Sequence, residues 1–151
     1  MPSKVLWDAA ATSRGNVLST ELNNLAAAAF SAAGTEVDNS TNLDQYGWLE
    51  LDYDLAANPA VGGYMSLFLL KALDGTNYEG VGDGTNGPGG HSLMAVIPIQ
   101  FTADHAAHIA MSPMFRLPPC KIKFLLQNNA SQAFAATGSV VELFTANDES
   151  Q

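Results

Sequence analysis

The chain has 151 residues, of which 47% are hydrophobic and 14% charged, so its composition suits one folded domain with an apolar core and excludes a disordered chain. Its net charge of −9 opposes nucleic-acid binding, because phosphate is bound by clustered Lys and Arg. No apolar run approaches the roughly 20 residues of a membrane-spanning helix, and the N-terminal residues lack the pattern of a secretory signal. We therefore expect a soluble protein that is made in a cytoplasm and binds neither nucleic acid nor membranes.

The helix signal of the chain is confined to its N-terminal part. Ser19 or Thr20 can cap a short helix in which Glu21 lies in the favourable first turn, and Gly34 would end it. The same residues also fit a short turn of helix followed by an extended, alanine-rich arm, and the sequence leaves both conformations open. We assign residues 1–34 to an N-terminal arm with a short helix.

From residue 35 onward, strands and turns replace the helix signal. Between Trp48 and Leu55 apolar and acidic residues alternate, which is typical of a strand with one buried face. The run from Tyr64 to Leu73 is apolar on both faces and indicates a strand that is covered on both sides. Further strands are predicted at Leu93–Phe101, Ala106–Met111, Lys121–Asn128 and Val140–Ala146. Pro98 removes a backbone donor and therefore favours an edge or a bulge.

The spacing of these strands indicates the fold class. About six or seven strands are separated by turn signals, which favours an antiparallel sandwich or jelly roll. No long helical segment lies between them, which argues against a parallel α/β sheet. The sequence therefore predicts one mainly β domain, with an antiparallel β-sandwich or jelly roll at residues 35–151 and a short N-terminal helix or arm before it.

Three carboxylates share one face of the strand that begins at Trp48. Glu50, Asp52 and Asp54 alternate with apolar residues. Paired carboxylates can catalyse glycoside hydrolysis when they flank a sugar at a set separation. The outward face of a half-buried strand is polar in any case, so we interpret these residues as a solvated face.

Other candidate chemistry in the sequence is equally weak. Asp104, His105 and His108 lie close together, but in a strand the two histidines point to opposite faces, which favours a structural pair over a metal site. The sole cysteine, Cys120, excludes an internal disulfide and a cysteine zinc site, and a buried or half-buried thiol is expected. The glycine-rich loop at residues 79–90 lacks the lysine of a phosphate-binding loop. We therefore predict no enzyme, no cofactor and no bound metal.

Five short stretches occur in order along the chain: LSTELNNL at residues 18–25, VDNSTNL at 37–43, LDGTNY at 73–78, LPPCKIKF at 117–124 and ATGSV at 136–140. Taken together in this order, they resemble small virion proteins of tailed bacteriophages. The resemblance is to capsid decoration (cement) proteins in particular. It implies a β-sandwich that binds the major capsid protein on the outside of the virion, often as a homotrimer, after synthesis in the cytoplasm of the host bacterium.

A decoration protein needs partner contacts, and the alanine-rich segment at residues 26–33 is the first candidate. It carries almost no charge, so Ala26, Ala29 and Phe30 are candidate contacts with a neighbouring subunit. The alternative is that the segment merely covers its own sheet.

Two further groups of candidate contacts lie in the C-terminal third. Met114 and Phe115 lie between prolines and suit an adaptable apolar contact with a partner. The alternative is that they belong to the ordinary core at a sheet edge. Arg116, Lys121 and Lys123 form a small basic cluster in the sequence. We hypothesise that this cluster faces an acidic capsid shell.

A second function stays open beside capsid binding. A head- or tail-fibre module would bind a host receptor or a glycan through Trp48, Tyr78 and the glycine-rich loop, because aromatic rings stack on sugars. A carbohydrate-active or metal-dependent enzyme is the third and least supported alternative.

Overall fold

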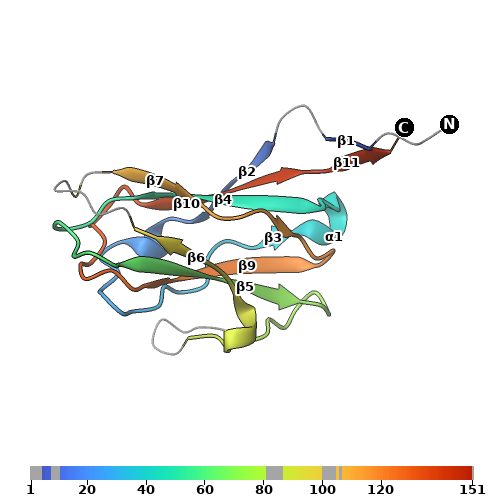
Figure 1. Ribbon diagram of the computed structural model, residues 1–151. Coiled ribbons are helices and arrows are strands. Elements are labelled where there is room, and N and C mark those ends of the chain that lie inside the picture. The colour runs from blue at the N-terminus through green and yellow to red at the C-terminus, as the bar shows by residue number, and fades with distance from the viewer. Residues whose placement is uncertain (1–4, 8–10, 81–86, 100–104, 106, 151) are drawn as a thin grey trace.

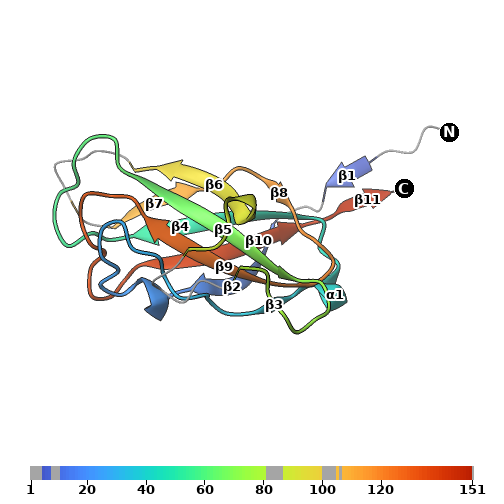
Figure 2. The same ribbon diagram turned by 90° about the horizontal axis from the view of Figure 1, so that it is seen from below.

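The computed structural model describes residues 5–7, 11–80, 87–99, 105 and 107–150, and of residues 5–7 and 148–150 it describes the backbone alone. Two antiparallel sheets lie face to face (Figures 1 and 2). The five-stranded sheet has the order β2 (Thr12–Leu18), β10 (Val140–Ala146), β4 (Tyr46–Tyr53) and β7 (His108–Met111), with β8 (Phe115–Arg116) paired to the start of β4. The four-stranded sheet has the order β3 (Val37–Asp38), β9 (Lys121–Asn128), β5 (Tyr64–Ala72) and β6 (Leu93–Pro98). The prediction of a mainly β, antiparallel sandwich is confirmed.

The core lies between the two sheets, where the alternating strand patterns place their apolar residues. In β4 the alternation predicted from the sequence is present, and Leu49, Leu51 and Tyr53 are buried. From the opposite sheet, Leu67 of β5 and Phe124 of β9 enter the same cluster. Burial of each such side chain contributes roughly 1.5–3 kcal/mol relative to leaving it exposed, so the paired inner faces hold the fold together.

The outer face of the four-stranded sheet is also covered, as the two-sided apolar pattern of β5 predicts. Phe68, Leu70 and Leu125 are buried although they point away from the main core. Phe30 lies on Phe68, with ring centroids 5.9 Å apart. The long connection between β5 and β6, which contains the turn η2 (Gly90–Ser92), folds back below this sheet in Figure 1. The chain therefore covers one outer face of the sandwich with its own loop.

The short N-terminal helix is not confirmed. A single 3-10 turn, η1 (Thr20–Leu22), is followed by extended chain, and left-handed backbone at Asn24 (φ 55°) and Ala28 (φ 63°) prevents a helix from continuing. Such a short helix is marginal by itself. Hydrogen bonds to β9 replace it, because Ser31 N–H donates to Leu126 O at 2.8 Å and Gly34 N–H to Phe124 O at 2.9 Å.

Residues 12–34, which the sequence analysis placed in an arm, therefore lie within the sandwich. Strand β2 pairs with β10, and the extended segment runs antiparallel to β9 until it becomes β3. The backbone of β1 (Val5–Trp7) pairs with β11 (Asp148–Ser150), and this ribbon extends away from the sandwich in Figure 1. The first and last described strands, β1 and β11, thus lie together at one end of the molecule.

The remaining predicted strands differ from the observed ones at their ends. β6 ends at Pro98 and is an edge strand, as that proline predicts. β7 begins at His108, later than predicted, because only residues 108–111 pair with β4. Residues 100, 101 and 106 of the predicted strands lie outside the described residues.

Candidate partner-binding surfaces

The alanine-rich segment covers its own sheet. Ala28 N–H donates to Asn128 O at 2.6 Å, and Phe30 forms a bridge with Gln127 of β9. Ala29 is half-buried against the core, whereas Ala26 is exposed. The backbone of the segment is thus hydrogen-bonded to β9 within the chain. Its contact with a neighbouring subunit stays a prediction, which now concerns the exposed Ala26.

Met114 and Phe115 point to different environments. Phe115 packs against the core, with its ring 6.1 Å from that of Phe124 in an edge arrangement. Met114 is 47% exposed. Phe115 therefore fits the alternative of core at a sheet margin, and of this pair Met114 alone is presented outward.

The three basic candidates do not form one free cluster. Arg116 belongs to the five-stranded sheet, and its guanidinium lies 5.7 Å from the ring centroid of Tyr46. Lys121 and Lys123 belong to the four-stranded sheet and point away from the core, because Ile122 between them is buried. Neighbours in the sequence are thus separated by the crossing from one sheet to the other.

Both lysines of β9 have partners within the chain. The Lys121 ammonium lies 2.9 Å from a carboxylate oxygen of Glu36, and the Lys123 ammonium lies 4.9 Å from the ring centroid of Tyr78. The Tyr78 hydroxyl donates to Glu36 at 2.6 Å. This bond and Lys121 lower the pKa of Glu36, whereas burial and then the bond to Glu36 raise the pKa of Tyr78. The lysines therefore help to hold the long loop on the sheet.

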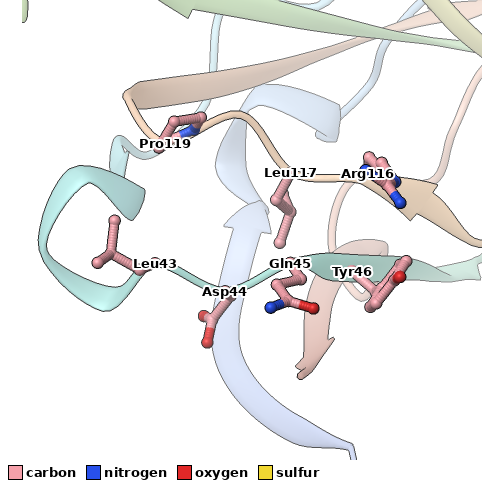
Figure 3. A pocket seen from close by; sticks show the side chains of 7 residues that line it. All are labelled: Leu43, Asp44, Gln45, Tyr46, Arg116, Leu117 and Pro119. Carbon is pink, nitrogen blue, oxygen red and sulfur yellow. The ribbon is translucent and has the colours of Figure 1, made fainter. Parts of the chain in front are cut away.

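A pocket of about 460 Å³ opens at the end of the sandwich near α1 (Asn39–Asn42) (Figure 3). It is lined by Leu43, Asp44, Gln45, Tyr46, Arg116, Leu117 and Pro119. The Asp44 carboxylate is bound by Arg14 at 2.7 and 2.8 Å. The Asn39 side chain holds the backbone on both sides of the pocket, donating to Asp44 O and Pro118 O at 2.9 Å. The pocket thus has mixed walls, in which Leu43, Leu117 and Pro119 lie beside polar side chains that include the exposed Arg116.

The outer face of the five-stranded sheet carries apolar side chains beside acidic ones. We define the open face as Trp48, Glu50 and Asp52 of β4, Ile109 and Met111 of β7, and Glu142 and Phe144 of β10. Trp48 of β4 lies directly opposite Phe144 of β10. Glu50 of β4 lies opposite Glu142 of β10 on one side and opposite Met111 of β7 on the other. A shallow, mainly apolar depression of about 240 Å³ on this face is lined by Ala11, Trp48, Glu50, Met111 and Phe144.

The sequence predicted a solvated strand face here, and the structure modifies that prediction. Glu50 and Asp52 are half-buried between apolar neighbours. One Asp52 carboxylate oxygen is buried and has no hydrogen-bond partner among the residues that the structure describes. The alternation of Val140, Glu142 and Phe144 was a usable signal for the missed part of this face, but the sequence does not reveal which strand lies beside β4.

Residues of catalytic type do not converge in the described part of the chain. His105 lies 3.9 Å from an Asp54 carboxylate oxygen, while the His108 ring lies 5.6 Å from that of Tyr53, and Asp104 is outside the described residues. No group of three or more His, Cys, Asp or Glu side chains within the described ranges could hold a metal ion. The Cys120 thiol is buried, as predicted, and burial raises its pKa.

The described residues include no helix of the length and apolar character needed to cross a membrane. Comparisons of the chain with protein-family models, with curated proteins and with solved structures find no match. Function is therefore inferred from the geometry of the open face, of the pocket near α1 and of the loop that covers the four-stranded sheet.

Proposed function

We propose that this chain is a virion structural protein of a tailed bacteriophage, a capsid decoration (cement) protein that binds the major capsid protein on the outer surface of the shell. It acts without a cofactor and without catalysis, as a homo-oligomer with trimeric symmetry. It is made in the cytoplasm of the host bacterium and is found in the finished virion. Its mechanism is bridging, because a protein that binds only the assembled shell stabilises that shell by mass action.

The observation that carries this proposal is the difference between the two outer faces of the sandwich. One is covered by the chain's own loop, whereas the other presents Trp48 and Phe144 beside Met111, which is 58% exposed. Exposed apolar patches of this kind mark surfaces that contact other molecules. The five sequence stretches that resemble decoration proteins give the class of partner, and the β-sandwich fits that resemblance.

Co-sedimentation with purified capsids tests the proposal directly. We expect the protein to move with the shells at a copy number comparable to that of the major capsid protein. Shells with the bound protein should release their DNA at a higher temperature than bare shells. Absence of binding to intact capsids under low and moderate salt would overturn the proposal.

A fibre module that binds a glycan or a receptor is the second candidate, and Trp48 on the open face favours it. An indole beside carboxylates can stack on a sugar ring and orient its hydroxyls. The chain contains two tryptophans, so a Trp7→Phe variant reports on Trp48 alone. A saturable change of its fluorescence with a glycan, together with only a few copies per virion, would favour the fibre role over decoration.

A further inference from the structure

Of the two outer faces of the sandwich, the open face is the one that the long loop between β5 and β6 does not cover. In Figure 1 the long loop lies beyond the four-stranded sheet, whereas on the opposite side the start of β2 and the β1–β11 ribbon rise beyond one end of the β2–β10–β4–β7 sheet. Ile109 is 67% exposed and Met111 is 58% exposed. The centres of protein interfaces are enriched in aromatic residues and Met, so the apolar part of this face suits a protein partner.

The charges of the open face are not balanced within the described chain. Glu50 and Glu142 are direct cross-strand neighbours, an arrangement of like charges that destabilises a sheet. Glu142 accepts a hydrogen bond from the Ser13 hydroxyl, which satisfies one oxygen but leaves the charge. Asp52 adds a third carboxylate, one oxygen of which is buried and has no hydrogen-bond partner in the described part of the chain. These three carboxylates would therefore be stabilised by positively charged groups placed near them.

The basic side chains of the described residues are engaged elsewhere. The pairs are Arg14 with Asp44, Lys71 with Glu79, Lys121 with Glu36, Arg116 with the Tyr46 ring and Lys123 with the Tyr78 ring. Cations that neutralise Glu50 and Glu142 must therefore come from a partner or from outside the described residues.

A second copy of this chain fits the open face poorly. In a two-fold symmetric contact the same patch meets itself. Glu50 and Glu142 lie in the middle of the patch and would face their counterparts across the interface. Juxtaposed like charges cost several kcal/mol at an interface, so a two-fold contact through this face is unfavourable. In a three-fold contact the face would meet a different patch of the neighbouring copy, whose described basic side chains are engaged as above, so the complementary surface belongs to a different protein.

We infer that the open face binds a protein surface that presents Arg or Lys between apolar side chains, with the cations over Glu50 and Glu142 and the apolar groups over Trp48, Phe144 and Met111. The identity of that partner as the major capsid protein rests on the proposed function. The inference reverses the sign of the capsid contact expected from the sequence, in which basic residues of this chain were to face an acidic shell.

A selection from a random displayed-peptide library on the full chain tests the chemistry of the face without a known partner. We expect enriched peptides to carry Arg or Lys flanked by apolar residues and to bind more weakly as salt increases. Binding should fall about tenfold or more in a Glu50→Gln/Glu142→Gln variant. A Glu21→Gln/Glu36→Gln variant, which removes the same charge away from the open face, should bind like the wild type.

Several outcomes would overturn the inference. They are a selection that yields no peptide, enrichment of acidic or uncharged peptides, equal binding to both double variants, and self-association of the wild type through the open face at neutral pH. Trp48 fluorescence in a Trp7→Phe background shows whether a peptide occupies this face, since occupancy changes the indole environment.

Capsid co-sedimentation of the same variants separates this inference from the proposed function. If the wild type and the Glu50→Gln/Glu142→Gln variant bind capsids equally, decoration stands and the inference about the open face is wrong. If no form binds capsids while basic peptides still bind the open face, the inference stands and the proposed function is wrong.

Discussion

Gly34 lies where the extended N-terminal segment passes the end of β2. A Cβ atom at this position would lie 1.9 Å from Val17 O and 2.7 Å from a Leu18 methyl carbon. The backbone cannot easily move away, because Gly34 N–H donates to Phe124 O and Thr35 N–H donates to Val17 O, each at 2.9 Å. Gly34 is thus needed for close approach between backbones.

We expect Gly34→Ala to lower the free energy of unfolding by about 1–3 kcal/mol, as for other overpacked buried sites. Urea unfolding measures the change. Gly90→Ala is the matched control, since a Cβ there meets no atom within 4 Å, and it should change stability by no more than about 0.5 kcal/mol. Equal stability of the two variants would show that the Val17 contact is not restrictive.

Glu36 makes stability depend on pH in the acid range. The Tyr78 hydrogen bond, and then Lys121, lower its pKa from the ordinary value of 4.5. A carboxyl group whose pKa is lowered by folding contributes stability that is fully present above its ordinary pKa. That contribution is lost as pH falls from about 4.5 through the lowered pKa.

We therefore expect Glu36→Gln to be less stable than the wild type near pH 7, with a difference that shrinks as the pH falls well below 4.5. Urea midpoints at several pH values test this. Glu21→Gln removes the same charge away from Tyr78 and serves as the control. A difference between Glu36→Gln and wild type that stays constant with pH would contradict the assigned role of Glu36.

At the scale of elements, the sequence predicted those strands whose pattern is set by burial. The alternation in β4 and the two-sided apolar run in β5 both appear as predicted. The conformation of residues 19–34 was harder to predict from the sequence, because the edge of β9 offers hydrogen bonds that override a weak local helix preference. Tertiary pairing, which the sequence does not display, decided that conformation.

Pairing between strands also explains why the candidate surfaces were only partly predictable. Arg116 and Lys121 are close in the sequence, yet the chain crosses from β8 to β9 between them and so changes sheets. Trp48 and Phe144 are far apart in the sequence, yet they are cross-strand neighbours. The open face therefore became visible only with the register of β4 and β10.

The register of β4 and β10 leads to a prediction about stability. Because Glu50 and Glu142 repel each other, we expect Glu50→Gln to raise the free energy of unfolding by about 0.2–1 kcal/mol. Urea unfolding at low salt measures the gain, and added salt should reduce it because it screens the repulsion. A loss of stability at low salt would mean that the carboxylate is held by a favourable contact within the chain.

At the scale of the whole molecule, the two outer faces of the sandwich differ. The four-stranded sheet is closed by the loop, which Tyr78, Glu36 and the two lysines of β9 hold in place. The five-stranded sheet keeps apolar side chains at its surface but places carboxylates among them. Surface charge of one sign keeps copies of a protein apart.

The carboxylates of the open face should therefore prevent self-association as well as select a partner. We expect Glu50→Gln/Glu142→Gln to self-associate at lower concentration than the wild type, because the substitution keeps the apolar area and removes the repulsion between copies. Sedimentation velocity over a range of concentrations measures this, relative to whatever oligomer the wild type forms. The Glu21→Gln/Glu36→Gln variant has the same net charge, so a similar increase in that variant would assign the effect to total charge and not to the open face. An increase confined to the first variant, reversed by an added Met111→Ser substitution, would place the new contact on the apolar part of the open face.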